Sequence, residues 1–376
     1  MRRAMGVKVL FLRSNPVDPD PRVEKEASAL AEAGYEVRVV GWDRLGSLPE
    51  RERREFGLVE RLRIKGDFGK GFGNLPSLLK FQVALLLYLV RKRSAYEILH
   101  ACDFDTVLPA VLVGRIFRKS IVYDVFDFYA DMIRQAPKWF RRLIRFIDQN
   151  LMGWVDAVIL ADESRIEQIK GAKPKRLVVI YNSPNVYRGC SQTSAPPPLK
   201  IVYVGILQTD RGILEVFDVL EKHPEWELDL GGFGGDEELI RKRAEGMPNV
   251  RFHGRIPYEK VLDLTCRSHV LFATYDPSIP NHRFSSPNKL FEAMAMGKPI
   301  IVARGTGMDR LVEALGMGYV VEYGNLRELE AALRDVVSWT EEQRRAFAER
   351  VRAVFQERFS WGKMKERLWA LYAELS

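Results

Sequence analysis

The stretch from residue 284 to residue 302 constrains the fold more than any other part of this chain. It leads from a polar loop, through an apolar segment with helical spacing, into Gly-Lys-Pro and a short apolar run. Serine is a common helix cap, proline suits the first helical turn, and glycine followed by proline ends a helix. We therefore predict a helix that Ser285 and Ser286 cap and Gly297 ends, with a buried strand behind it.

The start of this helix has the properties of an anion site. Its first backbone N–H groups have no partner within the helix, and the aligned peptide dipoles make that end positive. Lys289 adds a full charge in the first turn, beside Asn288. Glu292 follows three residues later on nearly the same helix face. The pattern predicts a phosphate at the helix start and a ribose hydroxyl at Glu292.

The chain divides into two parts with similar patterns. Its 376 residues are enough for two domains, and 47% apolar with 29% charged residues is typical of a soluble globular protein. Alternating strand and helix patterns stop at a polar, proline-rich segment and then resume. We predict domains at 1–185 and 200–355, a linker at 186–199, and a C-terminal helix at 356–376. That helix either crosses back to the first domain or packs in the core of the second.

Polar residues follow the predicted strands of the first domain. The carboxyl ends of parallel strands are where such sheets bind ligands. The residues at these ends, or at the helix start that follows, are Asn15, Arg22, His100, Asp103, Asp124 and Asp127. Arg22 is equally compatible with an exposed helix start, and His100 with a buried core position.

The second domain repeats the arrangement with glycines and cations. Gly205 and Gly232 follow two of its predicted strands, where glycine lets a ligand come close to the backbone. Arg211 begins the helix after the first strand and can bind a diphosphate with its two-pronged guanidinium. Arg255 follows a further strand. We therefore place a candidate phosphate site at Arg211 and Lys289.

The sequence Ser-Pro-Asn-Lys-Leu-Phe-Glu-Ala-Met-Ala-Met-Gly-Lys-Pro-Ile-Ile at 286–301 resembles the donor-binding helix of the GT-B glycosyltransferases, specifically their retaining family 4. Weaker resemblances cover 15–26, 98–127, 205–212 and 250–257. The resemblance implies an α/β fold of two Rossmann-like, doubly wound parallel-sheet domains that face each other across a cleft. Two family positions differ here, where Phe284 replaces a glutamate and Ile206 replaces a cation.

The resemblance implies a hexosyltransferase that moves a sugar from a nucleoside diphosphate sugar to an acceptor hydroxyl with retention. A UDP-sugar is favoured over a GDP-sugar, and we expect neither a cofactor nor a catalytic metal. The implied donor-binding residues are Gly205, Arg211, Gly232, Arg255, Ser285, Ser286, Asn288, Lys289 and Glu292. The implied catalytic residues are His100, Asp103, Asp127, Arg211 and Lys289, with Asn15 and Arg22 on the acceptor side. Two alternatives remain, a nucleotide-sugar 2-epimerase and a non-catalytic, membrane-bound partner that binds nucleotide sugar.

Most of the net charge of +8 comes from residues 51–93, which hold eleven basic and four acidic residues. A second basic segment, 137–151, has aromatic and aliphatic residues at helical spacing. A basic amphipathic surface suits an anionic membrane face, and a lipid-linked acceptor would lie there. The alternative is that these apolar stripes pack on the sheet. The apolar run 81–90 is too short to span a bilayer, and we find no nucleic-acid recognition motif.

The three cysteines, Cys102, Cys190 and Cys266, show no CxxC spacing. We expect neither a disulfide framework nor a zinc site, as in the reducing cytosol. The basic start of the chain leads into a predicted strand rather than a signal peptide. The sequence thus predicts a cytoplasmic protein, peripheral to the inner face of the cell membrane.

Overall fold

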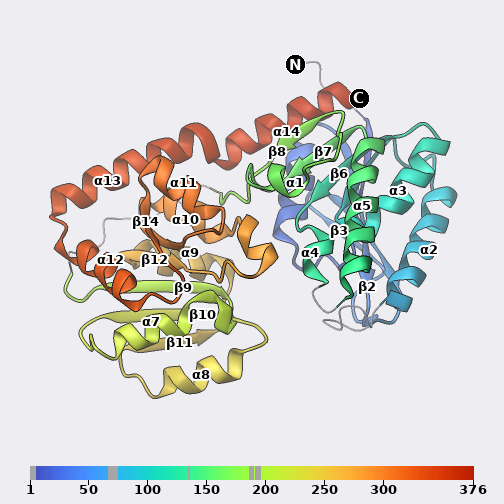
Figure 1. Ribbon diagram of the computed structural model, residues 1–376. Coiled ribbons are helices and arrows are strands. Elements are labelled where there is room, and N and C mark those ends of the chain that lie inside the picture. The colour runs from blue at the N-terminus through green and yellow to red at the C-terminus, as the bar shows by residue number, and fades with distance from the viewer. Residues whose placement is uncertain (1–5, 67–74, 134–135, 186–189, 191–195) are drawn as a thin grey trace. The chain divides into compact units, whose positions relative to one another are not determined.

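The computed structural model describes residues 6–66, 75–133, 136–185, 190 and 196–376. The chain forms two compact units, Met1–Tyr181 with Met364–Ser376 as unit 1 and Asn182–Lys363 as unit 2 (Figure 1). Most of the predicted linker lies outside the described residues. No helix in the described part of the chain is both long and apolar enough to cross a membrane.

Unit 1 is built on an eight-stranded sheet in the order β3-β4-β2-β1-β5-β6-β7-β8. Its strands are β1 Lys8–Leu12, β2 Glu36–Asp43, β3 Arg51–Arg54, β4 Gly57–Arg63, β5 Ile98–Cys102, β6 Ser120–Val125, β7 Ala157–Leu160 and β8 Leu177–Val179. All neighbours run parallel except β3 and β4. The strand order reverses between β1 and β5, so the crevice at their carboxyl ends is where such a sheet binds ligands.

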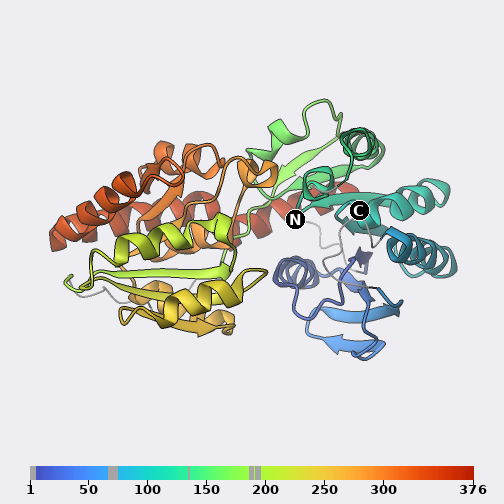
Figure 2. The same cartoon turned by 60° about the horizontal axis from the view of Figure 1, so that its bottom comes forward.

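Helices cover both faces of the unit 1 sheet. They are α1 Pro21–Glu32, α2 Leu75–Arg91, α3 Phe104–Ile116, α4 Tyr129–Met132, α5 Lys138–Trp154, α6 Arg165–Gln168 and α14 Trp361–Leu375. On one face α2, α3 and α5 lie side by side (Figures 1 and 2). Their inner residues form one core with Leu10, Leu12 and Leu99 of the sheet. From Met364 onward α14 packs beside α1, where the Trp369 indole N–H donates to the Ala29 carbonyl at 2.7 Å.

Unit 2 has a six-stranded, fully parallel sheet in the order β11-β10-β9-β12-β13-β14. Its strands are β9 Lys200–Ile206, β10 Glu227–Phe233, β11 Val250–Gly254, β12 Val270–Ala273, β13 Ile300–Ala303 and β14 Gly318–Val321. Its helices are α7 Ile213–Leu220, α8 Glu237–Glu245, α9 Tyr258–Arg267, α10 Asn288–Met296, α11 Met308–Leu315, α12 Leu326–Ser338 and α13 Glu341–Val354. Shorter turns are η2 Thr209–Arg211, η3 Pro280–Phe284 and η4 Phe355–Phe359.

The predicted helix in the 284–302 stretch is α10, followed by the buried strand β13. Gly297 ends the helix with a φ of 64°, a conformation that favours glycine. The predicted serine caps are wrong. Pro287 holds the cap position, and no side chain caps the helix. Its first backbone N–H groups therefore keep their capacity to bind an anion.

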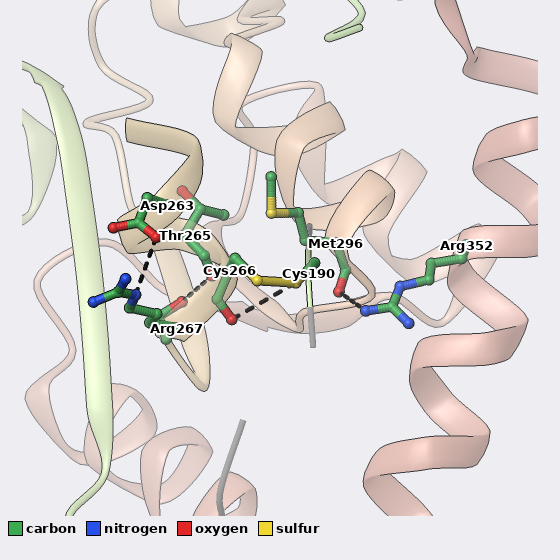
Figure 3. The surroundings of a disulfide bond; sticks show 8 residues. Cys190, Asp263, Thr265, Cys266, Arg267, Met296 and Arg352 are labelled. Carbon is green, nitrogen blue, oxygen red and sulfur yellow. Dashed lines mark hydrogen bonds and ion pairs between the residues drawn. A yellow bond between two sulfur atoms is a disulfide. The ribbon is translucent and has the colours of Figure 1, made fainter. Parts of the chain in front are cut away.

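Two of the cysteines are paired, contrary to the sequence prediction. Cys190 and Cys266 form a disulfide that packs against Leu262 and Met296 (Figure 3). The partners are 76 positions apart, one between the two domain patterns and the other near the end of α9. No local spacing signals such a pair, because the fold alone brings the two segments together. Cys102 is a buried free thiol.

Candidate active site

Lys289, in the first turn of α10, is a buried cation of unit 2. Its side chain is buried, and the ammonium lies 3.2 Å from the centre of the Tyr203 ring. Among the described residues its Nζ has no hydrogen-bond partner. Burial and the nearby Arg211 charge lower the Lys289 pKa, while Glu292 opposes them. An ammonium in this position is stabilised by any anion that enters, since a buried charge is costly without a partner.

Arg211 brings a second cation to the same place. Arg211 is the last residue of η2, and its guanidinium carbon lies 4.2 Å from the centre of the Tyr275 ring. The ammonium of Lys289 lies 5.7 Å from the centre of the same ring. The buried Nε has no hydrogen-bond partner in the described chain, and the ion pair with Asp210 is long at 3.5 Å. Two cations beside the open start of α10 suit a group with two negative charges, such as a diphosphate.

Glu292 lies one turn further along α10 and is also buried. Burial and the carboxylate of Glu292, through its charge and a hydrogen bond, raise the pKa of Tyr258 at the start of α9. The carboxylate also acts on the charge of Lys289, so the two groups lie near each other, and a carboxylate can accept more than one hydrogen bond. The ribose contact that the sequence suggests for Glu292 stays a prediction.

Two glycines allow atoms to approach closely at the ends of β9 and β10. A Cβ on Gly232, whose φ is 140°, would lie 1.8 Å from the Gly205 carbonyl oxygen. A Cβ on Gly205 would lie 3.3 Å from Nζ of Lys289. Gly232 is therefore required for β9 and β10 to lie together, and Gly205 leaves room for the ammonium.

An exposed apolar platform adjoins these strand ends. Phe233, the last residue of β10, is 51% exposed, and the Arg255 guanidinium carbon lies 5.0 Å above its ring centre. Ile206, where the family has a cation, is 47% exposed at the end of β9. A planar ring can stack on such a platform. The sequence prediction included Arg255 but missed Phe233, which is flanked by glycines on both sides in Gly-Gly-Phe-Gly-Gly.

The polar residues before α10 differ in what they offer. Ser286 is buried, and its carbonyl accepts a hydrogen bond from the Asn182 amide at 3.4 Å. The Ser285 N–H donates to the Thr306 carbonyl at 3.2 Å, which ties the loop to the segment after β13. Asn288 is exposed at the first position of the helix. The two serines thus shape the loop, while Asn288 is accessible to a ligand.

In unit 1, Arg22 is engaged inside the protein. Its guanidinium donates to both carboxylate oxygens of Asp124, at 3.0 and 2.8 Å, and to the Ile180 carbonyl at 2.8 Å. It also lies 3.2 Å from the buried carboxylate of Glu26. This position favours a structural role for Arg22 over the predicted contact with an acceptor.

His100 belongs to the same buried cluster. Its side chain has no exposed surface, Nδ1 is 2.6 Å from the Tyr372 hydroxyl, and the ring stacks on Phe11. Burial lowers the His100 pKa, so the ring is neutral near pH 7. Such a residue does not touch a substrate in this arrangement. Candidate metal-ligand atoms of His100, Glu26 and Asp124 lie within 4.8 Å of one another, but the Arg22 guanidinium already supplies the positive charge there.

Asp103 and Asp127 lie beside each other at the carboxyl edge. Asp103, with a φ of 66°, accepts hydrogen bonds from the backbone N–H groups of Phe126 and Asp127 and pairs with Arg13. Burial raises the pKa of Asp103 to about 6, against the effect of Arg13. Asp127 is partly exposed and pairs with Arg165 at 3.1 Å. These two carboxylates, unlike His100, are placed where a ligand can reach them.

Sequence reasoning missed Arg13, which holds this edge together. The guanidinium donates to Asp20 at 2.7 Å as well as to Asp103, and its carbon lies 4.3 Å from the centre of the Phe126 ring. Asn15 also donates to Asp20, at 2.8 Å, so its amide is used within the loop. Arg13 follows β1 directly, and a polar residue at the carboxyl end of a strand is the sequence signal that could have identified it.

Two family models match the chain in succession. Residues 19–183 match a glycosyl transferase 4-like domain, and residues 198–338 match the glycosyl transferases group 1 family. The chain belongs to the group 1 glycosyltransferases. Unit 1 of this glycosyltransferase thus corresponds to the first model, and the unit that carries Lys289 and Glu292 to the second.

Solved structures share the fold of this glycosyltransferase. A sucrose-phosphate synthase from Thermosynechococcus elongatus is 18% identical with a TM-score of 0.77, covering 98% of this chain and 99% of that one. HepE from Anabaena, solved with UDP and glucose, is 17% identical with a TM-score of 0.69, covering 98% and 100%. Both support the two-domain GT-B fold with parallel sheets.

A curated relative is the uncharacterized glycosyltransferase of Haemophilus influenzae. It is 28% identical over 138 residues, which is 35% of this chain and 38% of the relative. The match therefore spans well under half of the relative's length. It agrees with the family assignment of this glycosyltransferase.

Proposed function

We propose that the protein transfers a hexosyl group from a nucleoside diphosphate sugar to an acceptor hydroxyl, with retention of configuration. One observation carries the proposal. Lys289 and Arg211 are two largely buried cations beside one ring, with nitrogen atoms that have no hydrogen-bond partner among the described residues. A diphosphate would compensate both charges. UDP is the favoured nucleotide, in agreement with the UDP bound by the similarly folded HepE.

The same cations would assist the reaction. When the bond to the sugar breaks, negative charge grows on the leaving diphosphate, and fixed donors in a dry site stabilise it more than water does. Lys289, Arg211 and the open N–H groups of α10 are such donors. A departing phosphate oxygen can take the proton of the acceptor hydroxyl, so the step needs no strong protein base.

The remaining parts of the nucleotide have candidate contacts in unit 2. Glu292 would accept hydrogen bonds from the ribose hydroxyls, because its carboxylate lies next to the cations. The base would stack on the exposed Phe233, where Arg255 lies over the ring. The two alternatives, a 2-epimerase and a non-catalytic binder, use the same nucleotide contacts. They differ in the product, because only transfer gives a glycosylated acceptor.

The donor site is tested by thermal shift with UDP, GDP, ADP and their sugars. We expect UDP and UDP-sugars to raise the melting temperature of the wild type, since a ligand that binds only the folded state stabilises it. The apparent affinity for UDP, derived from the size of the shift at increasing UDP concentration, should fall at least tenfold in Arg211→Ala and in Glu292→Ala. Exposed residues provide matched controls, Arg327→Ala and Glu342→Ala, which should keep it. A full UDP response in both site variants would contradict the proposal.

We further propose that the acceptor is lipid-linked. The protein would then dock on the anionic inner face of the cell membrane. The supporting feature is the outer side of α2, α3 and α5, three neighbouring helices. Each carries apolar residues at helical spacing that are 36% to 73% exposed. They are Leu79, Val83 and Leu87 on α2, Leu108, Leu112 and Ile116 on α3, and Trp139, Leu143 and Phe146 on α5. We call this set the helical face.

The exposed charge on these three helices is mostly positive. Exposed cations in or just after the three helices are Lys80, Arg91, Arg93, Arg115, Arg118, Lys138 and Arg142. The helices contain two acids, Asp105 and Asp148, and Asp148 is buried where it accepts a hydrogen bond from Tyr123. Apolar side chains among cations complement an anionic bilayer surface.

Part of the predicted membrane segment 51–93 forms β3 and β4 and so lies outside the three helices of the helical face. Cations of β3 and β4 form ion pairs with neighbouring carboxylates, as in Arg51 with Glu60 and Arg61 with Glu52. These pairs offset part of the charge of β3 and β4, and we assign the docking role of segment 51–93 to α2, which carries the exposed apolar residues. The predicted segment 137–151 corresponds to α5.

Membrane docking is tested by sedimentation with phosphatidylglycerol vesicles. We expect Phe146→Ser combined with Arg142→Glu to lower the bound fraction at least fivefold, because both apolar insertion and charge attraction are lost. The matched control is Leu239→Ser combined with Arg327→Glu, which changes exposed residues of unit 2. Equal binding of both double variants would contradict the assignment, as would binding that survives high salt unchanged.

A further inference from the structure

Unit 2 has a pocket at the edge of the sheet opposite the donor site. It lies before β12, at the turn between α10 and β13, and against α13. Both strands begin there, so this is the amino edge of the parallel sheet. The pocket measures ≈ 550 Å³, counting the part that is open to solvent. We call it the amino-edge pocket.

Positive charge dominates the amino-edge pocket. Lys298, Arg344, Arg345 and Arg352 line it, and Glu341 is the one acid among its described lining residues. Lys298 is only 8% exposed. Burial, and then the charge of Arg352, lower the Lys298 pKa to about 7. A lysine held between low-dielectric walls and another cation is stabilised in its charged form when an anion binds.

The pocket also offers directed donors. The Nδ1 atom of His269 accepts the Lys200 N–H at 2.8 Å, so a neutral His269 ring carries its proton on Nε2. Arg352 donates one N–H to the Met296 carbonyl at 2.8 Å and has four others. Arg352 can therefore direct further N–H groups toward an oxyanion in the pocket.

One wall of the pocket is apolar. Trp339 and Phe347 lie with ring centres 4.9 Å apart, and Val336 and Pro299 continue the same lining. Tight packing fixes this wall, since a Cβ on Gly297 would lie 2.7 Å from Ala348 of α13. A ligand that fits has an anionic group and an organic part.

We propose that the amino-edge pocket binds a small phosphorylated metabolite, its phosphate at Lys298 and Arg352 and its organic part against Trp339 and Phe347. The site is separate from the donor site, which uses the first turn of α10, whereas Met296 and Gly297 at the other end of this helix line the pocket. The proposal does not depend on the transferase activity.

Calorimetry with phenyl phosphate as the probe tests the site. We expect binding to the wild type, to the donor-site variant Lys289→Met, and to the control Lys222→Met, which changes an exposed lysine. Binding should weaken at least tenfold in Lys298→Met, which fills the same space without a charge. Arg345→Ala, a change at an exposed position that does not endanger folding, should weaken it severalfold.

The pH dependence of sulfate binding gives a second measurement. Sulfate keeps its charge between pH 6 and pH 8, while Lys298 gains a proton as the pH falls through its pKa near 7. Binding should therefore be severalfold tighter at pH 6 than at pH 8. The other charged and titratable groups that line the pocket are Arg344, Arg345, Arg352, Glu341 and His269, and histidine is the residue type among them that ordinarily titrates in this range. The difference should persist in His269→Gln and vanish in Lys298→Met.

Several outcomes would overturn the proposal. Equal phenyl phosphate binding in wild type and Lys298→Met would place the anion elsewhere. Loss of binding in Lys289→Met alone would assign it to the donor site, and no heat at 10 mM probe would show no such site. UDP binding, measured on the same Lys298→Met sample, reports separately on the donor site and on correct folding.

Discussion

Replacing Lys289 with methionine should strongly reduce the rate of catalysis while leaving the protein at least as stable as before. The ammonium is buried and has no hydrogen-bond partner in the described chain, so removing it relieves a desolvated charge. We expect the free energy of unfolding to rise by about 1 kcal/mol, because the cost of desolvating one unpaired charge is removed. Turnover should fall by about 10² to 10³, the usual cost of losing one donor to the developing charge.

The measurement pairs denaturant unfolding with sugar transfer from the donor that the thermal-shift panel selects. Lys222→Met is the matched control and should change neither quantity. The sign of the stability change carries the test. A variant that loses activity and stability together would show that Lys289 supports the fold, and the assignment of a diphosphate to this ammonium would fail.

Replacing Arg22 with methionine should destabilise unit 1 by about 3 to 5 kcal/mol, as measured when one partner of a buried ion pair is removed. Asp124 is fully buried and receives two hydrogen bonds from this guanidinium. Burial, the Asp124 charge and other neighbours raise the pKa of Glu26, the second carboxylate of the cluster. Without Arg22 the Asp124 carboxylate would remain charged in a dry interior, or take up a proton at a similar cost.

Denaturant unfolding with Arg53→Met, an exposed arginine in β3, provides the comparison. The double variant Arg22→Met with Asp124→Asn should recover part of the loss, because it removes both charges rather than one. A loss below 1 kcal/mol in the single variant would mean that water or another cation compensates Asp124. Arg22 would then be available to a ligand, as the family resemblance implied.

The sequence predicted the helix α10 closely because everything that defines it is local. Helical spacing, a proline at the start and a glycine at the end determine where α10 begins and stops, and Lys289 and Glu292 share a face through spacing alone. The prediction failed for the serine caps, because Pro287 occupies the cap position.

Residues at strand ends were predicted to cluster, and they do, but their roles could not be read from position. Asp103 and Asp127 lie at the accessible edge, while His100 points into the core behind them and contacts Tyr372, 272 residues away. Whether a strand residue is buried depends on which distant segment packs over its side of the sheet. The C-terminal helix α14 covers His100, and no pattern near residue 100 announces it.

The sequence by itself determined the family, the two α/β patterns and the anion-binding helix, since each depends on residues within one or two turns or strands. Tertiary structure decided the rest. It paired Cys190 with Cys266, used Arg22 inside a buried cluster, left the helical face uncovered and made the amino-edge pocket from three separate segments. Burial and pairing depend on which distant segments meet, and that is settled by packing the whole chain, not by any local spacing.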